Sequence, residues 1–153
     1  MKRLTLVALL LGACLTGLPA LAQEHFTEGP VWAVNYIRTK PGKFDDYMKY
    51  LRSTYLVSAG EAKKQGLILD TKFLLNTPRD EKDWDIAIAT LYPSFGKALD
   101  FNQGDDDKRK AIAEKQFKTK DEAQQREVIA PRFAMRDALG TRYLREVNLK
   151  PLP

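Results

Sequence analysis

The sequence predicts an α+β fold with a four-stranded antiparallel sheet, and three patterns lead to this prediction. Apolar and polar residues alternate over 31–39, as in a strand. Apolar residues then recur at three- and four-residue steps over 41–65, as in an amphipathic helix. Two further alternating segments, 67–77 and 83–92, are joined by the short polar loop 78–82 as a hairpin. Strand, helix and hairpin in this order form the first part of a β-α-β-β-α-β fold.

The first strand, 31–39, is largely apolar on both faces. One face holds Val31, Ala33, Asn35 and Ile37, and the other holds Trp32, Val34, Tyr36 and Arg38. An apolar face is stable when it is removed from water. We therefore expect helices to cover one face of the sheet and a partner sheet to meet the other.

The first helix begins after a turn at Pro41-Gly42 and ends at Gly66. Its apolar stripe is Phe44, Tyr47, Met48, Leu51, Tyr55 and Ala59. A stripe of this kind is far more often part of a hydrophobic core than a cofactor site. We therefore expect it to pack on the sheet.

The two hairpin strands also divide into faces. One face of the second strand holds Leu67, Leu69, Thr71, Phe73 and Leu75. In the third strand, alternation places Trp84 on the same side as Ile86, Ile88 and Thr90.

A lengthened helical region is expected between the third and fourth strands. Its pieces are a short helix capped by Ser94, a charged helix from Asp105, and a helix capped by Thr119 and Glu122 that ends at Gly140. Residues 141–149 then alternate as the fourth strand.

The first 22 residues form a predicted signal peptide. Lys2 and Arg3 precede the uncharged run 4–18, and Ala20-Leu21-Ala22 supplies a cleavage site before Gln23. The remaining chain divides into an N-terminal tail at 23–30, the folded domain at 31–149 and a C-terminal tail at 150–153. We therefore expect a periplasmic or secreted protein without a membrane segment after cleavage.

Two alternatives to simple cleavage stay open. The apolar run approaches the roughly 20 residues that span a bilayer, so a retained anchor competes with cleavage. Leu11-Gly12-Ala13-Cys14 is similar to a bacterial lipobox, although the residues after Cys14 are apolar rather than tether-like. Cleavage before Gln23 removes the single cysteine, and with it any disulfide or thiolate chemistry.

Charge and motif content exclude several classes of function. The formal net charge of +5 falls to +3 when Lys2 and Arg3 are removed, which is too mild to indicate nucleic-acid binding. The sequence contains no nucleophile elbow, P-loop, dinucleotide fingerprint or zincin motif. Candidate acid–base carboxylates are limited to Asp70, Asp85 and Glu146, which are expected to be solvated or paired with nearby basic residues.

Two short segments carry a resemblance to a known fold family. They are Thr39-Lys40-Pro41-Gly42-Lys43-Phe44, where the first strand turns into the helix, and the third strand from Trp84-Asp85 to Tyr92-Pro93. Over residues 31–149 the chain resembles the ferredoxin-like dimeric α/β-barrel superfamily. This superfamily includes antibiotic-biosynthesis and haem-degrading monooxygenases, NIPSNAP-like proteins and stress-responsive barrel proteins. The resemblance implies a homodimer whose two sheets form a barrel, with a ligand held between sheet and helices.

Dimerisation would also cover an apolar patch. The side of the sheet away from the helices is expected to expose Trp32, Val34, Tyr36, Ile68 and Leu74. An exposed patch of this kind is typical of an interface.

Asn35 is the first candidate for a ligand site, because it is the one polar residue among Val31, Ala33 and Ile37 on its face. A buried amide needs hydrogen-bond partners or a ligand. Members that oxidise aromatic substrates are similar to this chain in carrying an asparagine on the first strand. The alternative is an asparagine that bonds to neighbouring backbone or water.

Other candidate pocket residues are Trp84, Tyr36, Arg38, Thr71 and Phe73. Trp84 would stack on an aromatic ligand, or serve as a core or interface anchor instead. In cofactor-free monooxygenases of this superfamily the substrate's own anion reduces dioxygen, so the protein binds, orients and stabilises charge. No cofactor is predicted. Haem degradation is not expected, because the haem-degrading members use a helical histidine and His25 is the only histidine here.

His25 supports a separate, minor hypothesis. Cleavage before Gln23 would place it third in Gln23-Glu24-His25, an arrangement that chelates copper(II) through the free amine, two amides and the imidazole. Coincidence is the competing interpretation, and cyclisation of Gln23 would abolish the site.

The sequence therefore supports two functions of different classes. The first is an exported dimer that binds a small hydrophobic or aromatic molecule, with or without a cofactor-independent, monooxygenase-like reaction on it. The second is a noncatalytic interaction or stress-protective module. An enclosed apolar cavity on the order of 300 Å³ or more, with the Asn35 amide exposed to it, would favour ligand binding, and a filled interior would favour the second.

Overall fold

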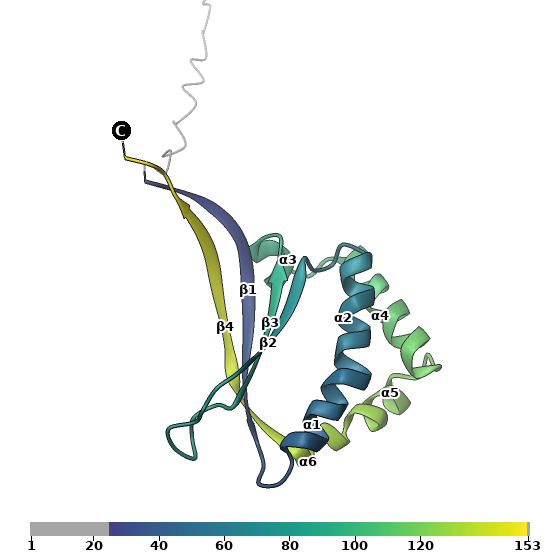
Figure 1. The fold of residues 1–153 in the computed structure, drawn as a ribbon. Helices are drawn as coiled ribbons and strands as arrows, with labels where there is room; N and C mark the ends of the chain where they lie inside the picture. The colour runs from purple at the N-terminus through teal and green to yellow at the C-terminus, as the bar shows by residue number, and fades with distance from the viewer. Residues whose placement is uncertain (1–24, 153) are drawn as a thin grey trace, which may run out of the picture.

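The computed structural model describes residues 25–152, and these form an α+β domain built on one antiparallel sheet (Figure 1). The strand order is β2-β3-β1-β4, which confirms the predicted four-stranded antiparallel sheet and is consistent with a ferredoxin-like layout. The strands are β1 (Phe26–Thr39), β2 (Asp70–Leu75), β3 (Ile86–Tyr92) and β4 (Arg136–Leu149). The predicted signal peptide and the residues Gln23 and Glu24 lie outside the described residues.

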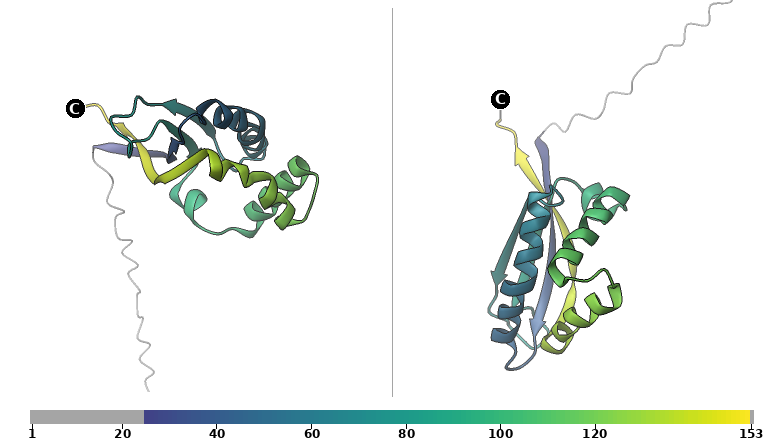
Figure 2. Two further views of the ribbon diagram at one scale, coloured as in Figure 1. Left: turned by 90° about the horizontal axis from the view of Figure 1, so that it is seen from below. Right: turned by 90° about the vertical axis from the view of Figure 1, so that its right-hand side faces the viewer.

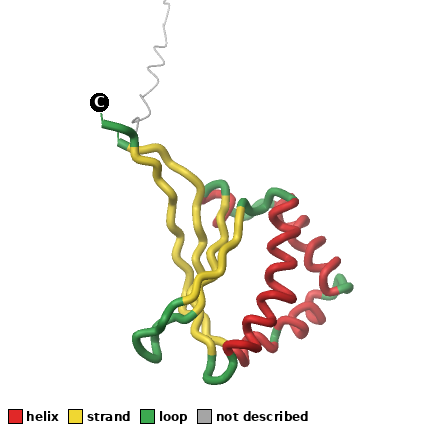
Figure 3. Tube along the Cα trace, in the orientation of Figure 1, coloured by secondary structure: helices red, strands yellow, loops and turns green. Residues whose placement is uncertain are grey.

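The helices gather on one side of the sheet, and the other side stays open (Figures 2 and 3). The first helical stretch consists of α1 (Phe44–Tyr50), the π-helical turn η1 (Leu51–Tyr55) and α2 (Leu56–Lys64). The second consists of α3 (Phe95–Leu99), α4 (Gln103–Phe117), α5 (Glu122–Ile129) and α6 (Pro131–Met135). We call the uncovered side the open face.

The first helical stretch ends as its sequence predicts. Gly66 has φ +71°, a conformation that glycine adopts without steric cost. The Gly66 N–H donates to the Lys63 carbonyl at 3.1 Å, and the Leu67 N–H donates to the Ala62 carbonyl at 2.9 Å. This pair of bonds is a Schellman motif, which satisfies carbonyls at the helix end and reverses the chain toward β2.

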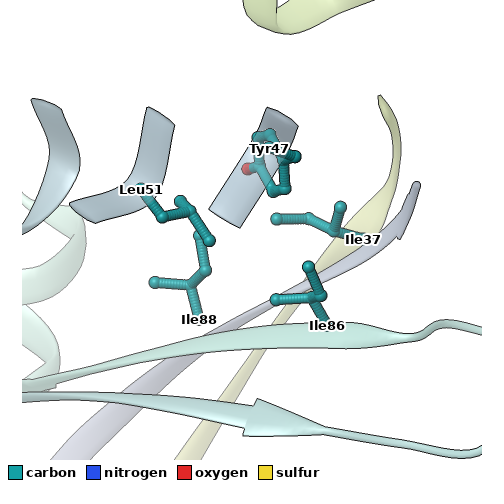
Figure 4. Packing of buried hydrophobic residues seen from close by; sticks show 5 residues of the cluster. All are labelled: Ile37, Tyr47, Leu51, Ile86 and Ile88. Atoms are coloured by element: carbon teal, nitrogen blue, oxygen red, sulfur yellow. The ribbon is translucent and has the colours of Figure 1, made fainter. Parts of the chain in front are cut away.

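The main core lies between the sheet and the first helical stretch. Figure 4 shows Tyr47 and Leu51 pointing from the helix toward Ile37 of β1 and toward Ile86 and Ile88 of β3. All five side chains are at most 3% exposed. Burying these side chains supplies hydrophobic free energy that holds the helix on the sheet. The predicted packing of the apolar stripe is thus confirmed.

The hairpin strands are shorter than predicted. β2 begins at Asp70 rather than at residue 67, and Leu67 and Ile68 instead pack with Ala62 and Ile112 in a second core cluster. Ile68 is 5% exposed and so does not belong to the open-face patch, contrary to the sequence prediction. The helical layer supplies a better apolar environment for it than the sheet edge does.

The prediction of an N-terminal tail at 23–30 is wrong for the part that the structure describes. β1 begins at Phe26, which pairs with Leu149 of β4, and the His25 carbonyl accepts a hydrogen bond from the Lys150 N–H at 2.9 Å. The two segments satisfy each other's backbone groups and form a ribbon that extends past β2 and β3 (Figure 1). The register shifts between Glu28 and Val31, and this irregularity hides the strand from an alternation pattern.

The end of the last helix was also predicted wrongly. α6 stops at Met135, and Gly140 lies inside β4 with φ +126°, next to a register shift opposite Tyr36 and Ile37. Glycine thus permits a bulge within the strand here rather than a helix end.

The helix caps agree with the sequence only in part. Ser94 caps α3 as predicted, because its hydroxyl accepts the Lys97 N–H. α4 starts earlier than Asp105, with Asn102 as its cap. Asp121, rather than Thr119, caps α5. An aspartate oxygen nearer the helix start satisfies the N–H groups that the predicted threonine does not reach.

Candidate functional site

Asn35 sits in the middle of the helix-covered face, opposite Ile88 on one side and Thr141 on the other. The Thr141 hydroxyl donates to the Asn35 Oδ1 at 2.6 Å. Within residues 25–152 the Asn35 amide nitrogen has no hydrogen-bond acceptor, so its two N–H donors remain available. Asn35 therefore has its side-chain oxygen held by Thr141 and an amide nitrogen without a protein acceptor in the described chain.

A cavity of about 240 Å³ lies beside Asn35, between the sheet and the helices. Ile37 and Ile88 contribute apolar lining from the sheet. The polar side chains around it include Asn35, Tyr47, Tyr50, Tyr55, Arg132 and Arg136. We call it the Asn35 pocket. Its volume is smaller than the roughly 300 Å³ expected of a ligand site, and its lining is more polar than the expected apolar cavity, but the interior is not filled, so the cavity suits a small molecule.

The π-helical turn places two of the tyrosines. In a regular α-helix, five residues advance about 500°, which would leave Tyr50 and Tyr55 roughly 140° apart around the axis. In η1 the Leu56 N–H instead donates to the Leu51 carbonyl, an i→i+5 bond that widens the turn. Both rings then line the same pocket. Single π turns occur frequently at functional sites.

The other aromatic contacts hold these rings in place. The Tyr47 and Tyr50 rings stack with centroids 5.9 Å apart, and the Tyr55 hydroxyl lies 3.1 Å from the Thr90 hydroxyl. Tyr55 also meets Phe73 edge to face at 5.9 Å. The aromatic wall is thus supported by the core behind it.

Two arginines enter the pocket from the second helical region. Arg132 belongs to α6 and Arg136 is the first residue of β4. The Nε of each guanidinium group is buried and has no hydrogen-bond partner. Neither arginine forms a salt bridge with a carboxylate in the described part of the chain. Both arginines are half-buried, so the Nε of each is removed from water without an acceptor, and the guanidinium group has no carboxylate partner in the described chain.

The protonation of the pocket follows from its burial. Desolvation raises the pKa of Tyr47 from 10.0 to about 12, although Arg136 and Arg132 oppose the shift. Desolvation also raises the pKa of Tyr55, against the hydrogen bond with Thr90. Both tyrosines are therefore neutral hydrogen-bond donors at physiological pH. Among the described residues that line the pocket there is no Asp, Glu or His.

Tyr36 and Trp84 pair with each other on the open face. Their rings meet edge to face with centroids 5.2 Å apart, and Trp84 packs beside Val34, Ala87 and Ala89. The prediction that Trp84 shares the side of Ile86 is therefore wrong. β3 begins only at Ile86, so strand alternation does not extend back to the tryptophan.

The remaining predicted pocket residues lie elsewhere. Arg38 lines a wider surface depression at the end of the sheet. Phe73 packs against the main core. The Thr71 hydroxyl is buried without a partner, on a strand two positions from β1 in the sheet. Of the predicted pocket residues, Tyr36 alone joins Asn35 in the lining of the Asn35 pocket. The other polar side chains of the lining were not predicted as pocket residues, and they are Tyr47, Tyr50, Tyr55, Arg132, Arg136 and Thr141.

The candidate acid–base carboxylates have structural partners. Asp85 is 8% exposed and accepts hydrogen bonds from the N–H and the hydroxyl of Thr39, rather than pairing with a basic residue. Asp70 pairs with Lys63 at 2.9 Å. Glu146 accepts the indole N–H of Trp32 at 2.6 Å on the open face. None of the three lines the Asn35 pocket.

Residues 25–152 contain no group of three or more His, Cys, Asp or Glu side chains able to hold a metal ion. The rest of the predicted copper motif lies outside the described residues. From His25 to Leu152, no helix has both the length and the apolar character that crossing a bilayer requires.

Comparisons with family models, with curated proteins and with solved structures find no match to this chain. The architecture and the Asn35 pocket are therefore the basis on which a function is proposed.

Proposed function

We propose that this protein is an exported homodimer that binds a small aromatic molecule in the Asn35 pocket. The observation that carries the proposal is one cavity lined by the Asn35 amide, by four tyrosines and by two arginines that have no carboxylate partner in the described chain. Aromatic walls supply apolar contact area, and the few polar groups fix the orientation of a ligand. A purely structural core would place apolar side chains at these positions.

The side chains that line the Asn35 pocket are better suited to binding and orienting a ligand than to transferring protons to or from it. Proton transfer requires a group whose pKa lies near the working pH, and the raised pKa values of Tyr47 and Tyr55 move these phenols away from it. A cofactor-independent, monooxygenase-like reaction remains compatible with this lining, because there the substrate's own anion reacts with dioxygen. The protein then contributes charge stabilisation and exclusion of water.

A noncatalytic role is the second candidate function. It is favoured by the absence of Asp, Glu and His from the described pocket lining. In this case the pocket would hold its ligand without converting it, and turnover would be absent even with a bound aromatic molecule. Oxygen uptake in the presence of that molecule separates the two candidates.

The proposed dimer would use the open face. Leu74 and Leu144, which lie on it, are 47% and 49% exposed. Trp32 and Tyr36 stand between them on β1 and are half-buried, whereas Val34, which was predicted to be exposed, is 6% exposed because it packs with Ala87 and Ala89 beneath the aromatic rings. Pairing of two such faces would remove this apolar surface from water.

The test of the proposal is native mass spectrometry of the mature protein purified from the periplasm. We expect a dimer that retains a small molecule. Replacement of Asn35 by Leu should abolish retention, because it removes the donors and fills the cavity. Asn76→Leu, in the hairpin and away from the pocket, is the control. Equal retention by Asn35→Leu and wild type would contradict the proposed site.

A further inference from the structure

We infer that the ligand of the Asn35 pocket is an anion, namely a small aromatic carboxylate whose charged group lies between Arg132 and Arg136. This inference rests on the proposed function and names the chemical class of the ligand. It depends on three features of the pocket, which are the unpaired positive charge, the excess of hydrogen-bond donors and the aromatic walls.

The positive charge has no counterpart in the described chain. Arg132 and Arg136 line one cavity, and each has a buried Nε without a partner. The nearest carboxylate in sequence, Asp137, pairs with Lys40 at 3.8 Å instead. A partly buried cation without an anion is costly, and a bound carboxylate would remove that cost through charge-assisted bonds.

The donors of the pocket exceed its acceptors. The Asn35 carbonyl oxygen already accepts the Thr141 hydroxyl, whereas the two amide N–H donors have no protein acceptor in the described chain. Guanidinium groups only donate, and neutral tyrosine hydroxyls are able to donate. A ligand that satisfies such a lining must be rich in acceptors, and a carboxylate offers two oxygens with about four acceptor sites.

The arginines stand four residues apart across a helix-to-strand junction. Arg132 is in α6, Arg136 begins β4, and both still line the same cavity. Arginine is the side chain best suited to planar recognition of a carboxylate, because its N–H groups form a fixed fork. The Arg136 guanidinium lies 5.7 Å from the centre of the Tyr47 ring, a cation–π contact that orients it without satisfying Nε.

The aromatic wall selects the remainder of the ligand. Tyr47 and Tyr50 stack on each other, and Tyr55 is held at its hydroxyl by Thr90. A cavity of about 240 Å³ accommodates a molecule of one or two rings. A flat ring against these tyrosines, with its carboxylate toward the arginines, would occupy both halves of the pocket.

The experiment compares benzoate with benzamide, a neutral probe of the same shape, by NMR titration of the mature protein. We expect benzoate to bind about tenfold or more tightly, because it adds charge-assisted hydrogen bonds. The Nε–H resonances of Arg132 and Arg136 and the side-chain N–H resonances of Asn35 should shift with benzoate. These resonances report on the site itself rather than on overall stability.

Variants separate a binding role from a structural one. Arg132→Gln and Arg136→Gln should each reduce the preference for benzoate about tenfold, while the affinity for benzamide stays within about twofold. Arg126→Gln is the matched control, because Arg126 lies on α5 and pairs with Glu122 at the surface. The two pocket variants should unfold at a temperature no lower than that of wild type, because each loses a half-buried cation that has no carboxylate partner in the described chain.

Each outcome bears on the inference. Equal affinity for the two probes at the Asn35 pocket would overturn the anion and leave the aromatic pocket standing. Binding of neither probe would overturn both the anion and the proposed pocket for small aromatic molecules. A benzoate preference that survives both arginine substitutions would also overturn the inference, because the charge would then be recognised elsewhere.

Discussion

Asp85 joins the end of β1 to the hairpin through its side chain and its backbone. Its carboxylate accepts the Thr39 N–H at 3.0 and 3.1 Å and also the Thr39 hydroxyl. Its own N–H donates to the Ile37 carbonyl at 3.0 Å. Ile37 lines the Asn35 pocket, so this carboxylate has a structural role close to the candidate site.

Replacing Asp85 by alanine should therefore destabilise the protein by about 2–3 kcal/mol, because the Thr39 N–H and hydroxyl are left buried without an acceptor. Chemical denaturation measures this difference in the free energy of unfolding. Asp137→Ala is the control, since Asp137 is exposed and its salt bridge with Lys40 is long. A similar effect of the two substitutions would show that the Asp85 contacts do not stabilise the fold.

Tyr47 gives a prediction for alkaline pH. Its pKa in the folded protein is about 12, above the usual value of 10.0, because burial disfavours the phenolate. The unfolded chain then releases this proton first, so the stabilisation is complete below pH 10.0 and is lost as the pH rises from there toward 12. Tyr47→Phe lacks the titrating group and should lose less stability over this interval. Urea denaturation at several alkaline pH values tests the difference, and parallel losses would contradict it.

At the scale of the element, the stability of the first helical stretch depends on the positions of its two glycines. Gly60 lies within α2, and Gly66 follows its end with φ +71°. A Cβ atom at either position would meet no atom within 4 Å, so space does not distinguish them. The two positions differ instead in backbone conformation, which is helical at Gly60 and left-handed at Gly66.

Gly60→Ala should stabilise the protein by about 0.5–1 kcal/mol, because alanine loses less entropy in a helix. Gly66→Ala should destabilise it by about 1 kcal/mol, because a Cβ is strained in the left-handed conformation of the Schellman motif. Thermal and urea unfolding of the pair measure both signs. An equal sign would mean that the turn at Gly66 relaxes to another conformation.

Sequence patterns predict the elements whose periodicity is regular. The faces of β1 and the stripe of the first helix follow directly from alternation and three- to four-residue spacing, and Asn35 was found in this way. Arg132 and Arg136 were not found, because their convergence depends on a change from helix to strand between Met135 and Arg136 that no Gly or Pro marks. Trp84 was misplaced because alternation was extended across an irregular residue.

The tyrosines illustrate a different limit. Tyr47 and Tyr55 were assigned to the core from their spacing, and their rings do pack there. Their exposure to a cavity depends on the π turn and on the position of α6, both of which are set by tertiary packing. Two signals in the sequence could have indicated a polar pocket. One is the cluster of three tyrosines in the first amphipathic helix, and the other is the pair of arginines four residues apart in the segment before the last strand.

At the scale of the whole molecule, the open face is the surface on which the proposed dimer depends. We expect light scattering on the mature protein to give the mass of two chains. Leu144→Glu should shift it to the mass of one chain, because a charge would be buried in the interface. Leu56→Glu on α2 is a matched control, since both leucines are 49% exposed and only Leu144 lies on the open face. A monomeric wild type would contradict the dimer.

The ribbon of β1 and β4 brings positions that are 125 residues apart in sequence into hydrogen-bond contact, through the His25 carbonyl and the Lys150 N–H at 2.9 Å. The domain is therefore nearly a closed loop of polypeptide. A short glycine-rich peptide linking these positions, with new ends opened in the exposed turn at 79–82, would give a circular permutant with every strand pairing retained. In such a permutant the chain ends would lie in the hairpin loop instead of at the end of the ribbon. The Asn35 pocket would keep all the residues that line it.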